Sequence, residues 1–121
     1  MILTTINKPR RLLHISYIQT VNIADLERGY EELKSLLGEF PTGFRLLADF
    51  CCLESMDPAA VDVIGRTMEL LEQHGLEIVV RVIPDPSKDI GFKIIGIFHY
   101  KNVPRIVVCE TMMEAARVLG L

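Results

Sequence analysis

The chain has 121 residues, of which 50% are hydrophobic and 24% are charged, so it is long enough for one domain with a buried core and too apolar to be disordered. Its net charge of −3 argues against a nucleic-acid binder that depends on phosphate contacts. The mean hydropathy is +0.30, yet the richest apolar stretch, Ile90 to Tyr100, is too short for a membrane span and is interrupted by Lys93 and His99.

The start of the chain lacks the basic and then apolar pattern of a signal peptide. Three cysteines cannot all pair with one another within one chain, and there is no C-x-x-C spacing. We therefore expect a cytoplasmic protein with free thiols, organised as one domain over residues 1–121.

The first third of the sequence predicts a hairpin followed by a helix. Ile2–Ile6 and Arg11–Ile18 have strand patterns and are separated by a short turn. Asn22 and Asp25 have the spacing of a helix N-cap and its reciprocal partner. The helix that follows carries an apolar stripe at helical spacing: Ile23, Leu26, Tyr30, Leu33 and Leu37. This amphipathic helix is expected to end at Gly38.

The middle of the sequence predicts two strands around a second helix. Phe44–Phe50 is mostly apolar, which is typical of a buried central parallel strand, and Cys51–Asp57 is expected to be a loop. Asp57 and Pro58 then have the preferred order for an N-cap and first helical residue, and the helix is expected to end at Gly75. The β-branched run Glu77–Ile83 predicts the next strand.

The segment after Pro84 is open to two interpretations. A third helix over Ser87–Phe98 is favoured, although Gly91 and Gly96 each weaken it by about 1 kcal/mol relative to alanine. A hairpin that pairs Ile94–Ile95 with Ile97–Phe98 is the alternative.

The last segment predicts a strand and a helix. Arg105–Cys109 forms the strand, and the capping box from Thr111 to Glu114 opens a short final helix. The element order is then β-β-α-β-α-β-α-β-α. Strands that alternate with helices predict right-handed crossovers, hence an α/β domain with a mixed, mostly parallel sheet of about five strands and four helices.

This order resembles the STAS domain family, named for sulfate transporters and anti-sigma factor antagonists, with its SpoIIAA-like fold. The segments that carry the resemblance are Leu46-Leu47-Ala48-Asp49-Phe50-x-x-Leu53-x-x-Met56-Asp57, the helix of residues 57–74 with the strand after it, the apolar residues 90–98, and Thr111-x-x-Glu114-Ala115-Ala116. Together they cover nearly the whole chain.

The resemblance implies a non-enzymatic regulatory module that binds a protein partner, such as a kinase-like anti-sigma factor or a larger regulatory assembly. Members of the family that are switched by phosphorylation carry Asp-Ser-Ser/Thr-Gly at the start of the second helix. This chain has Asp57-Pro58-Ala59-Ala60 there, so the acceptor position falls on Ala59, which has no hydroxyl group. The resemblance therefore implies binding without phosphorylation at this position. The nearest hydroxyl belongs to Ser55, which precedes the helix.

The partner interface is expected at the predicted loop and second helix. Its candidate residues are Glu54, Ser55, Asp57, Ala59 and Asp62. These carboxylates do not follow a calcium-loop pattern, and no two histidines have metal-ligand spacing. We therefore expect no catalytic residues, no metal and no cofactor.

Two further features have both a structural and a functional interpretation. Cys51 and Cys52 are interpreted as small buried hydrophobes, with a redox or nucleophilic site as the alternative. The residues of the predicted third helix are apolar on nearly every face: Ile90, Phe92, Ile94, Ile95, Ile97 and Phe98. They are covered within the monomer, or they form a patch (Ile90, Phe92, Ile94, Ile95 and Phe98) that binds a partner or a second copy in a homodimer.

A second hypothesis for function follows from the same residues. An apolar pocket between the third helix and the sheet would bind a small ligand or a lipid.

Overall fold

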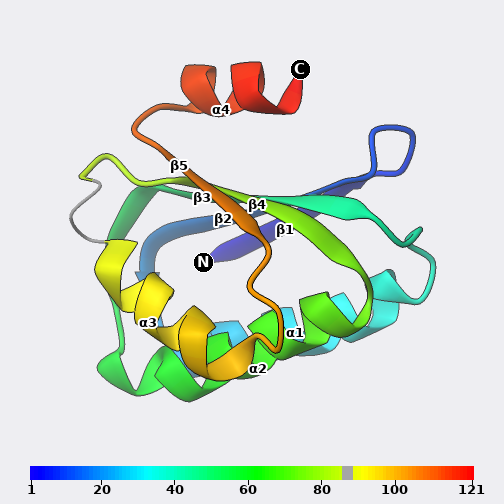
Figure 1. The fold of residues 1–121 in the computed structure, drawn as a ribbon. Coiled ribbons are helices and arrows are strands. Elements are labelled where there is room, and N and C mark those ends of the chain that lie inside the picture. The colour runs from blue at the N-terminus through cyan, green and yellow to red at the C-terminus, as the bar shows by residue number, and fades with distance from the viewer. Residues whose placement is uncertain (86–88) are drawn as a thin grey trace.

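Five strands form one sheet in the order β1-β2-β3-β4-β5 in the computed structural model, which describes residues 1–85 and 89–121 (Figure 1). The strands are β1 (Ile2–Asn7), β2 (Leu12–Val21), β3 (Phe44–Met56), β4 (Leu76–Val82) and β5 (Arg105–Cys109). The helices are α1 (Ile23–Leu37), the 3-10 turn η1 (Pro58–Ala60), α2 (Val61–Gln73), α3 (Ile90–His99) and α4 (Met112–Leu119).

The sheet is mixed in the predicted way. β1 and β2 form an antiparallel hairpin, and β2 to β5 are parallel to one another. Because neighbouring parallel strands follow one another in sequence, crossovers of one hand place α1, α2 and α3 on the same face. Figure 1 shows these three helices below the sheet and α4 alone above it. The predicted fold class is confirmed.

Local hydrogen bonds explain why α1 and α4 begin where the sequence predicts. The Asn22 side chain accepts from the Asp25 backbone N–H at 2.8 Å, and the Asp25 carboxylate accepts from the Asn22 N–H at 3.1 Å. The Thr111 hydroxyl accepts from the Glu114 N–H at 3.2 Å at the start of α4. Gly38 differs from expectation, since its φ of −61° is right-handed and makes no use of the freedom of glycine.

The prediction of a loop over Cys51–Asp57 is wrong, because β3 continues to Met56. Its second half pairs with the end of β2, from Ile18 opposite Cys52 to Val21 opposite Met56. Two irregularities interrupt this ladder, and they break the alternation by which a strand is recognised in a sequence.

The apolar segment before β5 is helical, so the alternative hairpin is wrong. α3 covers Ile90–His99, and the first residues of the predicted helix, 87 and 88, lie outside the described residues. The exposed backbone between α3 and β5 is fastened by Glu72 of α2, whose carboxylate accepts from the N–H groups of Lys101 and Asn102 at 2.9 and 2.8 Å.

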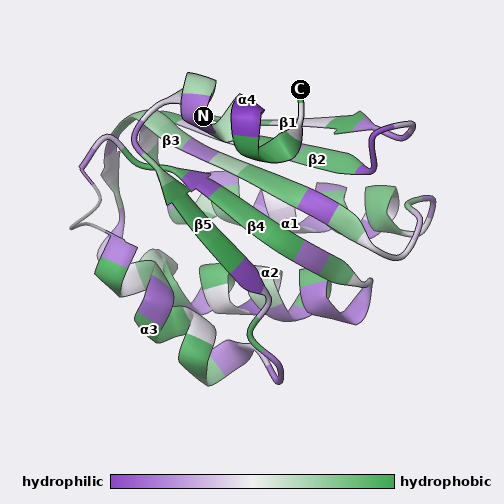
Figure 2. Cartoon of the chain, turned by 45° about the horizontal axis from the view of Figure 1, so that its top comes forward, coloured by the Kyte–Doolittle hydropathy of each residue, from purple (hydrophilic) through white to green (hydrophobic). Residues whose placement is uncertain are grey.

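The strands consist mostly of hydrophobic residues (Figure 2), and apolar side chains pack on both faces of the sheet. The face toward α1 and α2 holds the larger core, in which Leu13, Phe44 and Leu71 are almost completely buried. On the other face Leu47 and Val80 pack with the apolar side of α4. The carboxyl end of β3 extends beyond this core to Met56, and the candidate site lies there.

Gly65 allows α3 to approach α2 closely. A Cβ atom at this position would lie 2.3 Å from Nε2 of His99, a distance that real Cβ atoms essentially never show. The His99 ring thus lies directly against the backbone of α2, with its Nδ1 3.1 Å from the Glu69 carboxylate.

Replacing Gly65 with alanine is expected to destabilise the protein by about 1–3 kcal/mol, because the new methyl group displaces the His99 ring. The matched control is Gly91→Ala in α3, where an added Cβ meets no atom within 4 Å. The control is expected to be neutral or to stabilise by up to about 1 kcal/mol. Urea unfolding followed by circular dichroism measures both, and equal stabilities of the two variants would contradict the close approach.

Candidate functional site

The junction between β3 and α2 is shaped by Asp57 and Pro58. The Asp57 carboxylate accepts a hydrogen bond from the Ala59 N–H at 2.9 Å, which is the N-cap contact that the sequence predicts. Pro58 follows as the first residue of η1, and α2 begins only at Val61. The predicted helix start is therefore confirmed as a cap, but its first turn is 3-10 rather than α-helical.

The five predicted partner-binding residues are exposed on either side of this junction. They are Glu54 and Ser55 at the end of β3, Asp57, Ala59 in η1 and Asp62 in the first turn of α2. The Ser55 hydroxyl lies 3.2 Å from that of Thr20, and the Asp62 carboxylate lies 3.8 Å from Nε of Arg66. An exposed pair of this kind stabilises by about 0–1 kcal/mol, so Asp62 remains available to a partner.

An apolar groove runs between this junction and α3. We call it the junction groove; it has a volume of about 200 Å³ and is lined by Met56, Asp57, Pro58, Ala60, Val61, Ile64, Gly91, Phe92 and Ile95. Among the described residues, Asp57 alone contributes a charged side chain to this lining. The groove therefore joins two features that the sequence singled out separately, the acidic junction and the apolar third helix.

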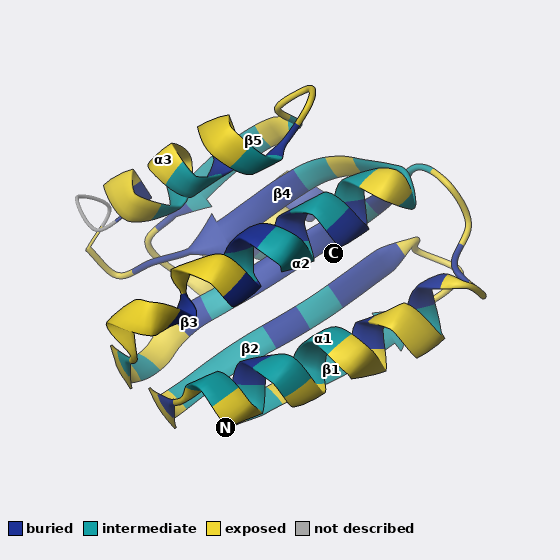
Figure 3. Cartoon of the chain, turned by 90° about the horizontal axis from the view of Figure 1, so that it is seen from below, coloured by how far each residue is buried: buried dark blue, intermediate teal, exposed yellow. Residues whose placement is uncertain are grey.

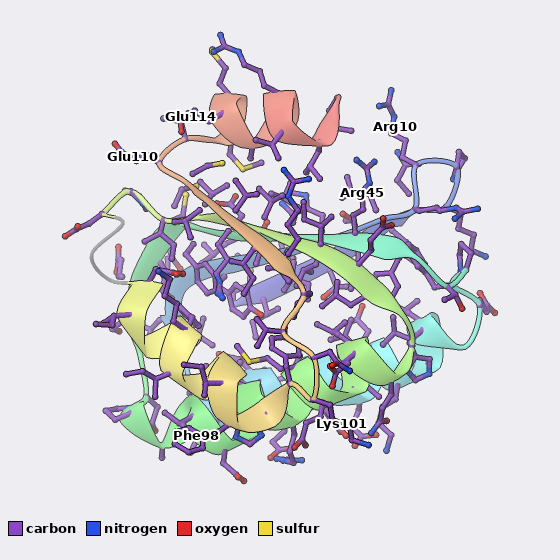
Figure 4. The ribbon with its side chains drawn as sticks, in the orientation of Figure 1. Arg10, Arg45, Phe98, Lys101, Glu110 and Glu114 are labelled. Carbon is purple, nitrogen blue, oxygen red and sulfur yellow. The ribbon has the colours of Figure 1, made fainter. Side chains whose placement is uncertain are left out.

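The outer face of α3 is apolar and uncovered in the described part of the chain (Figure 3). Ile90 is 66% exposed, Phe98 is 80% exposed, and Ile94 and Ile97 are exposed with them. Figure 4 shows Phe98 at the outer edge of the molecule, away from the sheet. The other two residues of the predicted patch, Phe92 and Ile95, are half-buried and line the junction groove instead.

A small cavity lies beneath α2 and α3 against the sheet, where the second hypothesis places a ligand. Its lining is apolar apart from Arg81, Thr67 and the hydroxyl groups of Tyr17 and Tyr100. Burial raises the pKa of Tyr100 to about 12. The cavity has a volume of about 50 Å³, whereas pockets for small ligands usually enclose roughly 300–1,000 Å³. It therefore offers room for water molecules but none for a lipid.

A buried ion pair fastens the start of α3 to β4. Nε of Arg81 lies 3.3 Å from Oδ1 of Asp89, and each residue is 3% exposed. The Arg81 guanidinium also lies 5.5 Å from the centre of the Phe92 ring. Burial raises the pKa of Asp89 and lowers that of Arg81, and each charge opposes the shift of the other.

The sequence analysis missed this pair. Oδ2 of Asp89 is buried and has no hydrogen-bond partner among the described residues. The sequence did contain a sign of this pair, because Arg81 interrupts the apolar run of the predicted strand Glu77–Ile83.

The three cysteines differ in their exposure to solvent. Cys109 is buried on β5, as a small hydrophobe should be, whereas Cys51 and Cys52 are both exposed. The interpretation of the adjacent pair as buried hydrophobes is therefore wrong.

The histidines have structural contacts in separate places. His14 lies 3.1 Å from the Ser16 hydroxyl, His74 lies 3.0 Å from the Leu70 carbonyl oxygen, and His99 packs on α2. Within residues 1–85 and 89–121 no three metal-ligating side chains are close enough to hold an ion. In the same residues no helix has the length and apolar character needed to cross a bilayer.

Comparison with known proteins shows the fold. No family model matches the chain, and no curated protein matches its sequence. The unphosphorylated anti-sigma factor antagonist SpoIIAA is similar in structure with a TM-score of 0.66, 19% identity and full coverage of both chains. The phosphorylated form of the Bacillus cell fate determinant SpoIIAA gives 0.67, with 17% identity over 98% of this chain and 99% of that one.

A third structure is an uncharacterized protein with a SpoIIAA-like fold from Shewanella loihica. Its TM-score is 0.69 and its identity is 16%, over 98% of this chain and 92% of that one. The chain thus has a SpoIIAA-like fold, as the sequence analysis expects.

Breaking the Arg81–Asp89 pair is expected to lower the free energy of unfolding. Asp89→Leu leaves a buried guanidinium without its counter-ion, which should destabilise the protein by about 3–5 kcal/mol. The double variant Arg81→Met/Asp89→Leu removes both charges and should recover most of this loss. Urea unfolding measures both, and a double variant that is no more stable than the single one would contradict a pairwise role.

Proposed function

We propose that this chain is a non-enzymatic regulatory module that binds a protein partner at the junction groove. The observation that supports this proposal is the groove itself, an apolar hollow of about 200 Å³ that is open to solvent and has the carboxylate of Asp57 in its lining. Apolar surface left open at one place is typical of interaction sites.

The chemistry of the groove suggests the chemistry of its occupant. Met56, Val61 and Ile95 offer contacts to an aliphatic or aromatic side chain. Glu54 and Asp62 are exposed nearby in the chain and would attract lysine or arginine residues beside that side chain. The partner we propose therefore presents an apolar anchor flanked by basic residues.

The structural neighbours support a regulatory rather than an enzymatic role. SpoIIAA is described as an anti-sigma factor antagonist and as a cell fate determinant. By this likeness the partner is a kinase-like anti-sigma factor or a related regulatory assembly in the cytoplasm. Its binding here does not depend on phosphorylation at Ala59, which lacks a hydroxyl group and whose N–H is already bonded to Asp57.

The outer face of α3 extends the same interface. Ile95 lines the groove and Ile94 is exposed next to it, so a partner seated in the groove reaches α3 without a break. An exposed apolar patch such as the outer face of α3 favours association with another molecule. We assign it to the protein partner rather than to a second copy of the chain.

Val61→Glu is expected to reduce recovery of the partner at least about tenfold, because a carboxylate would be buried in the apolar groove. Glu54→Arg should weaken binding through charge repulsion. The measurement is affinity capture of the full chain from its native cells, followed by quantitative mass spectrometry.

Two variants of the same chemistry serve as controls. Val118→Glu places a carboxylate on α4, at the opposite face of the sheet, and Glu32→Arg reverses an exposed charge on α1. Both should retain the partner. A partner that survives Val61→Glu and Glu54→Arg would exclude the groove, and a wild-type dimer abolished by Phe98→Glu in sedimentation would assign α3 to a second copy.

A further inference from the structure

The two adjacent thiols of β3 lie side by side. Consecutive side chains of a regular strand point to opposite faces, which would keep neighbouring thiols apart. Here the pairing moves from Ser16 opposite Asp49 to Ile18 opposite Cys52, so that β3 holds one residue more than β2 over this step. This bulge brings the two sulfur atoms of Cys51 and Cys52 to 3.6 Å from each other, and both residues are exposed.

Asp49 makes the two thiols unequal. Its carboxylate accepts the Cys51 N–H at 2.9 Å and contacts the Cys51 thiol as well. This contact, followed by burial and by the neighbouring Cys52, raises the pKa of Cys51 to about 12. Cys51 therefore keeps its proton at neutral pH, beside a carboxylate that can receive it. Cys52 is the thiol from which a first attack is expected.

We propose that Cys51 and Cys52 form a reversible dithiol–disulfide pair that is oxidised by low-molecular-weight disulfides such as oxidised glutathione. The Cys52 thiolate attacks one sulfur of glutathione disulfide, forms a mixed disulfide and releases one glutathione thiolate. The Cys51 sulfur then attacks Cys52 Sγ as its proton passes to Asp49, and the second glutathione leaves. One dithiol and one glutathione disulfide thus give one protein disulfide and two glutathione thiols.

Closure of this disulfide must alter the bulge. The sulfur atoms have to move from 3.6 Å to about 2.05 Å, the length of a disulfide bond. Adjacent Cα atoms are about 3.8 Å apart, below the usual range of about 4.4–6.8 Å for a disulfide, so the backbone cannot stay as it is. A bridge of this kind is easily reduced, which suits a reversible modification.

The change would reach the surface beside the thiols. A hollow of about 390 Å³ is lined by Cys51 together with Glu54, Ser55 and Phe92. Oxidation would therefore reshape the acidic end of β3. The redox chemistry does not depend on the docking proposal, because it requires only the two thiols, the carboxylate and the bulge.

The test is to incubate the reduced full chain with oxidised glutathione and to digest it with trypsin after blocking free thiols. The peptide of residues 46–66 contains both Cys51 and Cys52 but not Cys109. In the oxidised protein this peptide is expected to carry no blocking group and to weigh about 2 Da less than the unblocked dithiol peptide, the mass of two hydrogen atoms. Treatment with dithiothreitol should restore the dithiol mass.

Single substitutions separate the roles of the two thiols. Cys51→Ser should stop at the mixed disulfide and retain at least about tenfold more bound glutathione than the wild type, because no second thiol displaces it. Cys52→Ser should react more slowly than Cys51→Ser. The control Cys109→Ser, which removes the buried thiol, should close the disulfide as the wild type does.

Three results would overturn the proposal. They are glutathione that stays bound to both cysteines of the wild type, disulfide-linked dimers in place of the internal bridge, and a wild-type chain that stays reduced while Cys51→Ser reacts. Both serine variants replace exposed side chains, and circular dichroism verifies that they are folded before the comparison.

Discussion

The ion pair between Arg81 and Asp89 fixes the position of α3, and the candidate docking face depends on that position. Removing two charges from water is expensive, and the attraction between them offsets the cost only when they remain together. Arg81 lies on β4, which is hydrogen-bonded to a strand on each side, so its partner Asp89 must meet it at one place. The start of α3 is thereby tied to β4 through a contact that few other geometries would satisfy.

The opposite end of α3 is held by packing rather than by charge. His99 lies against the backbone of α2 at Gly65, and Glu72 accepts the N–H groups of the two residues after Tyr100. With both ends fastened, α3 stays at a set distance from the start of α2. The junction groove is the space that remains between them, and Phe92 separates it from the small interior cavity.

Features that depend on neighbouring residues could be predicted from the sequence, and features that depend on distant ones could not. The cap of α1 needs only Asn22 and Asp25, and the parallel order follows from strands that alternate with helices. The end of β3 escaped prediction because its bulges destroy the period of two that identifies a strand. The exposure of Cys51 and Cys52 could not be predicted for the same reason, because pairing with β2 sets the orientation of their side chains. The Arg81–Asp89 pair required knowledge of how the chain returns to the sheet after β4.

These contacts show where the apolar residues that raise the mean hydropathy of the chain remain exposed. Most apolar residues are buried or half-buried, but Ile90, Ile94, Ile97 and Phe98 are exposed together on one short helix. A surface helix usually turns polar side chains outward, and a loosely held helix with this composition would rotate or sink to bury them. α3 is held at both ends and keeps them in solvent, at a cost in hydration free energy that the rest of the fold must offset. The fold tolerates this cost where the apolar helix continues into an apolar groove, which is the arrangement expected of a surface that is covered in a complex.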